Sequence, residues 1–161
     1  MKTLFLVRHA KSSRDDASLP DRERPLNARG LHDAPALGKR LAKHRVQPDL
    51  MVSSPATRAW TTAQLVAAEI GYEVTAIVVD ERLYAARVSD LLAVIRALDG
   101  KADCVMLFGH NPEFSELAGR LSGEAVDMPT CAVAQFAFDS PSWTNVGVLA
   151  PTRFTLDSPG K

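Results

Sequence analysis

Three short segments of this sequence carry side chains that suit the capture and transfer of a phosphoryl group. Arg8 and His9 follow the apolar run Leu4–Val7, Arg58 follows a second short apolar run, and His110 follows a third. A guanidinium group presents a planar fork of donors that matches phosphate oxygens, and a neutral imidazole is nucleophilic near neutral pH. Each segment stands at or just past the end of an expected strand. We therefore expect these four side chains to converge on one site.

The four residues have different expected roles. His9 is the candidate nucleophile, provided that one ring nitrogen is held as N–H and the other keeps a free lone pair. Arg8 and Arg58 are expected to grip phosphoryl oxygens, and His110 to donate a hydrogen bond to one of them. The alternatives are a structural histidine at a strand end and surface arginines that pair with carboxylates.

Two further residues are weaker candidates. Glu81 directly follows an expected strand and is the candidate proton donor for the leaving group, and Lys11 is a candidate donor to the substrate, although each also fits a solvated loop. Expelling an alkoxide needs a good acid, whereas an imidazole departs readily, so a weak acid would favour a phosphoramidate substrate. His32 and His44 lie among charged neighbours and are expected to face solvent.

Apolar, β-rich runs alternate with amphipathic stretches along the chain. The expected strands are Lys2–Val7, Asp49–Ser53, Val74–Val79, Asp103–Phe108, Cys131–Phe138 and Val146–Thr155. The expected helices are Asn27–His44, Pro55–Gly71, Ser89–Gly100 and Pro112–Gly123, the last three with Ser54, Ser89 and Asn111 as caps. Pro35 either kinks the first helix or marks a later start.

This alternation predicts a three-layer α/β/α fold. Helices cover both faces of a mostly parallel central sheet, and the C-terminal segments supply an antiparallel hairpin or edge strand. In such folds the ligand crevice lies beyond the carboxyl ends of the strands. The segments that carry Arg8, His9, Arg58 and His110 all fall there, so the predicted fold and the predicted site agree.

Composition narrows the function further. At 161 residues with 46% hydrophobic content, the chain is expected to form one domain spanning 1–161. The 19 basic and 19 acidic residues cancel, so no overall field favours nucleic acid or an anionic membrane. No apolar run approaches the ~20 residues that span a bilayer, and the apolar start is too short for a signal peptide. We expect a cytoplasmic enzyme. No nucleotide-binding glycine loop or metal-ligand spacing occurs, so we expect no cofactor.

The same residues resemble the histidine phosphatase superfamily, whose hallmark is an Arg-His-Gly turn after the first strand. The match runs in order through Leu6–Ala10, Arg24–Gly30, Ser53–Ala63 and Gly109–Pro112. Ala10 replaces the hallmark glycine, and we expect that its backbone does not need a positive φ. The short chain is similar to the compact, SixA-like phosphohistidine phosphatase branch.

This resemblance implies a phosphoglycerate mutase-like fold and a phosphohistidine intermediate on His9. It also implies phosphate binding by Arg8, Arg58 and His110, no metal, and a tentative carry-over of the family's acid to Glu81. The leading partner is a protein that carries phosphohistidine. The alternatives are a phosphatase of small phosphoesters or phosphosugars, and a phosphate-binding module without turnover.

Overall fold

The first strand, β1, lies inside a six-stranded sheet whose order is β3-β2-β4-β1-β5-β6. The structure is a computed structural model that describes residues 1–160. The strands are β1 (Lys2–Arg8), β2 (Leu50–Ser53), β3 (Val78–Val79), β4 (Cys104–Gly109), β5 (Val133–Phe138) and β6 (Arg153–Asp157). Strands β3, β2, β4 and β1 pair in parallel, whereas β5 and β6 pair antiparallel. The mostly parallel sheet with an antiparallel edge is confirmed.

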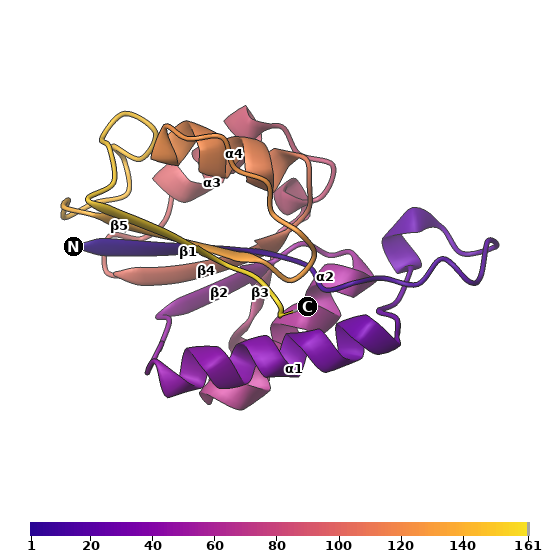
Figure 1. The fold of residues 1–161 in the computed structure, drawn as a ribbon. Coiled ribbons are helices and arrows are strands. Elements are labelled where there is room, and N and C mark those ends of the chain that lie inside the picture. Colours follow the sequence, from indigo (N-terminus) through magenta and orange to yellow (C-terminus); the bar gives the residue numbers. More distant parts are fainter. Residues whose placement is uncertain (161) are drawn as a thin grey trace.

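Helices cover both faces of this sheet (Figure 1). They are α1 (Ala28–Lys43), α2 (Thr57–Ile70), α3 (Val88–Arg96) and α4 (Glu113–Ser122), joined by the 3₁₀ turns η1 (Asp21–Glu23), η2 (Val74–Ala76) and η3 (Glu81–Leu83). Helices α1 and α2 lie on one face, and α3 and α4 lie on the other. The predicted α/β/α layering is therefore confirmed. A domain spanning 1–161 stays a prediction, and Lys161 lies outside the described residues.

Strand β1 is buried on both faces because its apolar residues alternate between two cores. Leu4 and Leu6 belong to the core under α3 and α4, whereas Phe5 and Val7 belong to the core under α1 and α2. All four are at most 2% exposed. Burying each of these side chains contributes about 1.5–3 kcal/mol. The end of β1, where Arg8 lies, is therefore fixed by packing on both sides.

The pairing of β1 with β4 brings two distant segments to the same level. The strands run parallel with Arg8 opposite Gly109. The backbone N–H of His9 then donates to the carbonyl of Gly109 at 3.1 Å. His9 and His110 therefore leave neighbouring strand ends side by side, although 101 positions separate them in the sequence.

Several helix starts differ from the prediction by one or two residues. Helix α2 begins at Thr57 after Ala56, so Pro55 is not helical and the Ser54 side chain is not the cap. Helix α3 begins at Val88, before the predicted cap, and ends at Arg96. Helix α4 begins at Glu113.

Three other boundaries also need correction. Helix α1 begins at Ala28 and continues past Pro35, so the proline does not mark a later start. The predicted strand Val74–Val79 is a 3₁₀ turn followed by only two strand residues. The last strand occupies Arg153–Asp157 rather than Val146–Thr155, because much of the chain before it forms turns. Within residues 1–160, no helix has the length and hydropathy that a bilayer crossing requires.

Candidate active site

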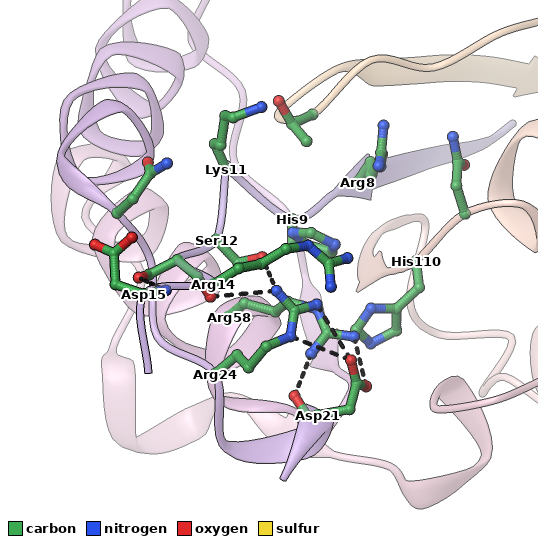
Figure 2. A pocket seen from close by; sticks show the side chains of 14 residues that line it. Arg8, His9, Lys11, Ser12, Arg14, Asp15, Asp21, Arg24, Arg58 and His110 are labelled. Atoms are coloured by element: carbon green, nitrogen blue, oxygen red, sulfur yellow. Dashed lines mark hydrogen bonds and ion pairs between the residues drawn. The ribbon is translucent and has the colours of Figure 1, made fainter. Parts of the chain in front are cut away.

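A cavity of about 530 Å³ opens at the carboxyl ends of β1 and β4 (Figure 2). It is lined by Arg8, His9, Lys11, Ser12, Ser13, Arg14, Asp15, Asp21, Arg24, Asn27, Arg58, His110, Asn111 and Thr130. The structure thus brings together the four main predicted site residues and also Lys11. Glu81 is not among the lining residues.

The His9 ring is held in a defined tautomer. Its Nδ1 lies 2.6 Å from the carbonyl oxygen of Ala10. Because a carbonyl oxygen only accepts hydrogen bonds, Nδ1 carries the proton and Nε2 keeps its lone pair. The pKa of His9 is lowered to about 4, chiefly by burial. The Ala10 carbonyl opposes this shift, and the positive charges of Arg58 and Arg8 add to it. The ring is therefore neutral at physiological pH.

The turn after His9 tolerates alanine. Ala10 is fully buried, and its N–H donates to the Thr62 hydroxyl at 3.0 Å. The non-glycine residues with positive φ among residues 1–160 are Arg45, Ala85 and Cys131, so Ala10 is not one of them. The expectation that this position needs no glycine is confirmed.

His110 lies beside His9 from the neighbouring strand end. The ring centroids are 5.2 Å apart, and Nε2 of His110 lies 2.8 Å from the Ser54 hydroxyl. Burial lowers the pKa of His110 to about 3, assisted by the proximity of His9 and Arg58. Its Nδ1 is buried and has no hydrogen-bond partner within residues 1–160. A second neutral imidazole with an unused nitrogen therefore stands next to the first.

The two predicted arginines reach the cavity from different elements. Arg58, in the first turn of α2, donates through Nη1 to the Asp21 carbonyl at 2.7 Å and through Nη2 to its carboxylate at 3.0 Å. Arg8, at the end of β1, donates through Nη1 to the Met128 carbonyl at 3.0 Å. Burial lowers the pKa of Arg8, but a guanidinium group stays charged at neutral pH. The Nε of each arginine is buried and has no acceptor in the described residues.

The sequence reasoning missed a carboxylate inside the cavity. Asp21 accepts hydrogen bonds from the Tyr84 hydroxyl at 2.7 Å and from Arg58. Arg24 also donates to Asp21, through Nε and through Nη2, at 3.2 Å each. The Tyr84 hydroxyl, and after it the two arginines, hold the pKa of the Asp21 carboxyl well below its usual range. The charged sequence around Asp21 is typical of a solvated loop, so its composition gave no indication that Asp21 lies in the cavity. The only indication came from Arg24, which is the first residue of a segment, Arg24–Gly30, that resembles the family.

Glu81 lies apart from the four converging side chains. Both of its carboxylate oxygens accept from Arg22 Nη2 at 2.7 Å, and its side chain is 67% exposed. The Arg22 guanidinium in turn lies 5.6 Å from the centre of the Tyr84 ring. A role for Glu81 as the acid stays a prediction. His32 and His44 are exposed, as expected.

The donor set of the cavity suits an anion better than a metal ion. Among residues 1–160, His, Cys, Asp and Glu side chains form no cluster of three or more that could hold a metal ion. The cavity instead presents guanidinium groups and neutral imidazoles around His9. Such a set can bind a tetrahedral anion, offer a nitrogen lone pair to its central atom, and stabilise negative charge on its oxygens.

Comparison with known proteins agrees with this chemistry. A model of the histidine phosphatase superfamily (branch 1) matches residues 4–91, more than half of the chain. An uncharacterised chloroplast protein of Arabidopsis thaliana is 30% identical over 99% of this chain and 73% of its own length. A protein of Agrobacterium tumefaciens, provisionally named phosphohistidine phosphatase SixA, is 27% identical in sequence. Its crystal structure superposes with a TM-score of 0.81 and covers 98% of both chains.

The fold and the cavity define an α/β protein that gathers arginines and histidines at the carboxyl edge of a parallel sheet. The chain belongs to the histidine phosphatase superfamily, branch 1. Its length and fold are those of the compact, SixA-like form, as expected. A mycobacterial glucosyl-3-phosphoglycerate phosphatase also shares the fold, with a TM-score of 0.69 at 19% identity and 98% coverage of both chains. Membership in this superfamily supports phosphatase activity.

Proposed function

We propose that this protein is a metal-independent phosphatase that works through a phosphohistidine intermediate on His9, with protein phosphohistidine as its substrate. Nε2 of His9 attacks phosphorus and forms a P–N bond, while the bond to the leaving group breaks and the leaving group takes its electron pair. Water then attacks the phosphoenzyme. The P–N bond between phosphorus and His9 Nε2 breaks, its electron pair returns to Nε2, and inorganic phosphate leaves.

The observation that carries this proposal is the 2.6 Å contact between His9 Nδ1 and the Ala10 carbonyl. It leaves a lone pair on Nε2 of a ring that burial keeps neutral. Arg8 and Arg58 supply fixed positive charge beside that ring, where charge builds on the phosphoryl oxygens. The ring centroid of His110 lies 5.2 Å from that of His9, which supports a role for His110 in binding the same oxygens.

The carboxyl groups of the cavity favour a phosphoramidate substrate. Asp21 is held ionised by Tyr84 and the arginines and therefore does not act as a proton donor at neutral pH. The remaining lining carboxyl group, Asp15, is exposed, and Glu81 pairs with Arg22 outside the cavity. An alkoxide leaving group needs a positioned acid, whereas imidazole is a much better leaving group. Phosphohistidine therefore fits the available chemistry better than an alkyl phosphate.

Rapid quenching tests the intermediate directly. With a phosphohistidine peptide labelled in its phosphoryl group, the protein should acquire label that is acid-labile and base-stable. His9→Ala should abolish this label and lower kcat by about a thousandfold or more. The control is His32→Ala, which removes an exposed ring on α1 and should keep wild-type labelling. Full turnover by His9→Ala would refute the mechanism.

The choice between phosphoramidates and small phosphoesters or phosphosugars depends on Glu81. If Glu81→Gln lowers kcat on alkyl phosphates alone, the acid has a role and small phosphoesters become the better assignment. Equal losses of kcat on phosphoramidates and on alkyl phosphates would contradict the argument from the leaving group. Glu73→Gln, another exposed carboxylate, is the matched control. Tight phosphate binding without hydrolysis of any phosphoramidate would instead identify a binding module.

A further inference from the structure

The cavity carries more positive charge than one phosphoryl group neutralises. Five cations line it, against two carboxylates: Arg8, Lys11, Arg14, Arg24 and Arg58 against Asp15 and Asp21. Both histidines are neutral, because burial lowers their pKa values to about 4 and about 3. The excess is three positive charges, whereas a phosphoryl group carries about 1.5–2 negative charges at pH 7. The chain as a whole is neutral, so this excess is local.

The excess is concentrated on two side chains that the proposed chemistry does not use. Arg24 already donates to Asp21 and, through Nη1, to the Ser12 hydroxyl at 2.7 Å. Lys11 and Arg14 are exposed and line the cavity. Among residues 1–160, neither has a carboxylate within 4.0 Å. Two cations without counter-ions therefore face the same space as the phosphoryl site.

The backbone presents Lys11 close to His9 in a fixed position. The Asn27 N–H donates to the Lys11 carbonyl at 3.0 Å, and a Cβ atom on Gly30 would lie 2.2 Å from that oxygen. The first turn of α1 thus clamps this part of the chain. The Cα atoms of Lys11 and His9 are at most about 7 Å apart, because only Ala10 lies between them in the chain. In Figure 2, Lys11 lies on the opposite side of His9 from Asp21.

We propose that Lys11 and Arg14 form a second anion subsite, which binds a carboxylate or phosphate group adjoining the phosphoryl group of the substrate. This proposal rests on the proposed function, since it takes the phosphoryl group to lie at His9. The second anion has two sources with the same chemistry. It belongs either to an acidic residue that flanks phosphohistidine in a protein, or to an acidic group of a small phosphorylated metabolite.

Two phosphonates test the subsite without any turnover, because their C–P bonds are not hydrolysed by phosphoryl transfer. Wild-type protein should bind phosphonoacetate about tenfold more tightly than methylphosphonate, which lacks the carboxylate. Lys11→Gln and Arg14→Gln should each lower this preference about threefold, and the double variant should abolish it. The control Lys43→Gln removes an exposed cation and should keep the preference. Lys43 lies at the C-terminal end of the 16-residue helix α1, about 24 Å along the helix axis from the first turn that contacts Lys11.

Calorimetric Kd values decide the outcome. The subsite is overturned if wild-type protein shows no preference, or if the double variant keeps it. If the preference depends on Lys11 and Arg14 but no phosphohistidine peptide or phosphoester is turned over, the subsite stands and the proposed function fails. If turnover is present and the preference is absent, the proposed function stands and the subsite fails.

Matched substrates then distinguish the two sources. One pair consists of phosphohistidine peptides with aspartate or with alanine beside the modified residue. The other pair consists of 3-phosphoglycerate and glycerol 3-phosphate. The ratio of kcat/KM within a pair should be about tenfold for the true source and should fall in the Lys11→Gln, Arg14→Gln double variant. Equal losses on both members of each pair would place these cations on the phosphoryl group itself and overturn the proposal.

Discussion

Mild acid provides a quantitative test of the buried histidine pair. Burial lowers the pKa of His9 to about 4 and that of His110 to about 3, against an ordinary value of 6.5. Below about pH 6.5 the unfolded chain therefore binds protons that the folded chain does not, and the free energy of unfolding falls as the pH falls towards 4. Linkage gives a loss of about 2 kcal/mol for each histidine between pH 7 and pH 5, or about 4 kcal/mol for both.

Carboxyl groups contribute little to this loss. The pKa of Asp21 is held well below its usual range, so its contribution to stability is present above the unfolded pKa near 3.8. That contribution is lost only as the pH falls below about 4–5. Burial raises the pKa of Glu113, so this carboxyl group acts in the opposite direction and offsets part of the loss. Between pH 7 and pH 5 the loss itself therefore comes from the histidines.

Urea unfolding at the two pH values, at constant ionic strength, measures the effect. His9→Asn and His110→Asn should each remove about half of the loss in the free energy of unfolding, because each variant lacks one of the two buried rings that bind a proton on unfolding. His32→Asn, which changes an exposed ring, should show the full wild-type loss. A wild-type loss below about 1 kcal/mol, or variants that lose as much as the wild type, would refute the reasoning.

Three further outcomes follow from the geometry. Ser54→Ala should lower kcat/KM about tenfold with an unchanged circular dichroism spectrum, because His110 Nε2 loses its partner at 2.8 Å. Gly109→Ala should lower the free energy of unfolding by about 1–3 kcal/mol, because the added Cβ atom would lie 2.4 Å from the Phe114 ring. Gly100→Ala is the control, since its added Cβ atom would have no neighbour closer than 4.0 Å. Exhaustive chelation should leave turnover unchanged, and a loss that added divalent metal restores would contradict metal independence.

The convergence of the main candidates was predictable from the sequence for a simple reason. Parallel strands end at one edge of a sheet, so Arg8, His9 and His110 had to meet once β1 and β4 were neighbours. The apolar runs before them are buried on both faces and therefore leave a clear sequence pattern. Arg58 follows the same logic from β2, although α2 begins two residues later than its capping pattern indicates.

The surroundings of these side chains were less predictable, because they depend on partners far away in the sequence. Glu81 pairs with Arg22, 59 positions distant, and no local pattern specifies that choice over the cavity. Asp21 lies in a charged segment with no periodicity, yet Arg58 and Tyr84 fix it in the cavity from other elements. Side chains in loops are placed by such long-range contacts rather than by propensity.

The register of two interior strands also has an evolutionary consequence. Because Arg8 stands opposite Gly109, the gap between the two imidazoles is a property of main-chain alignment rather than of either side chain. Insertion or deletion of a single residue within β1 or β4 would displace one ring by about 3.3 Å and turn it towards the other layer of the protein. Lineages that retain this chemistry should therefore vary freely in the lengths of their surface loops, while these two segments keep a constant length.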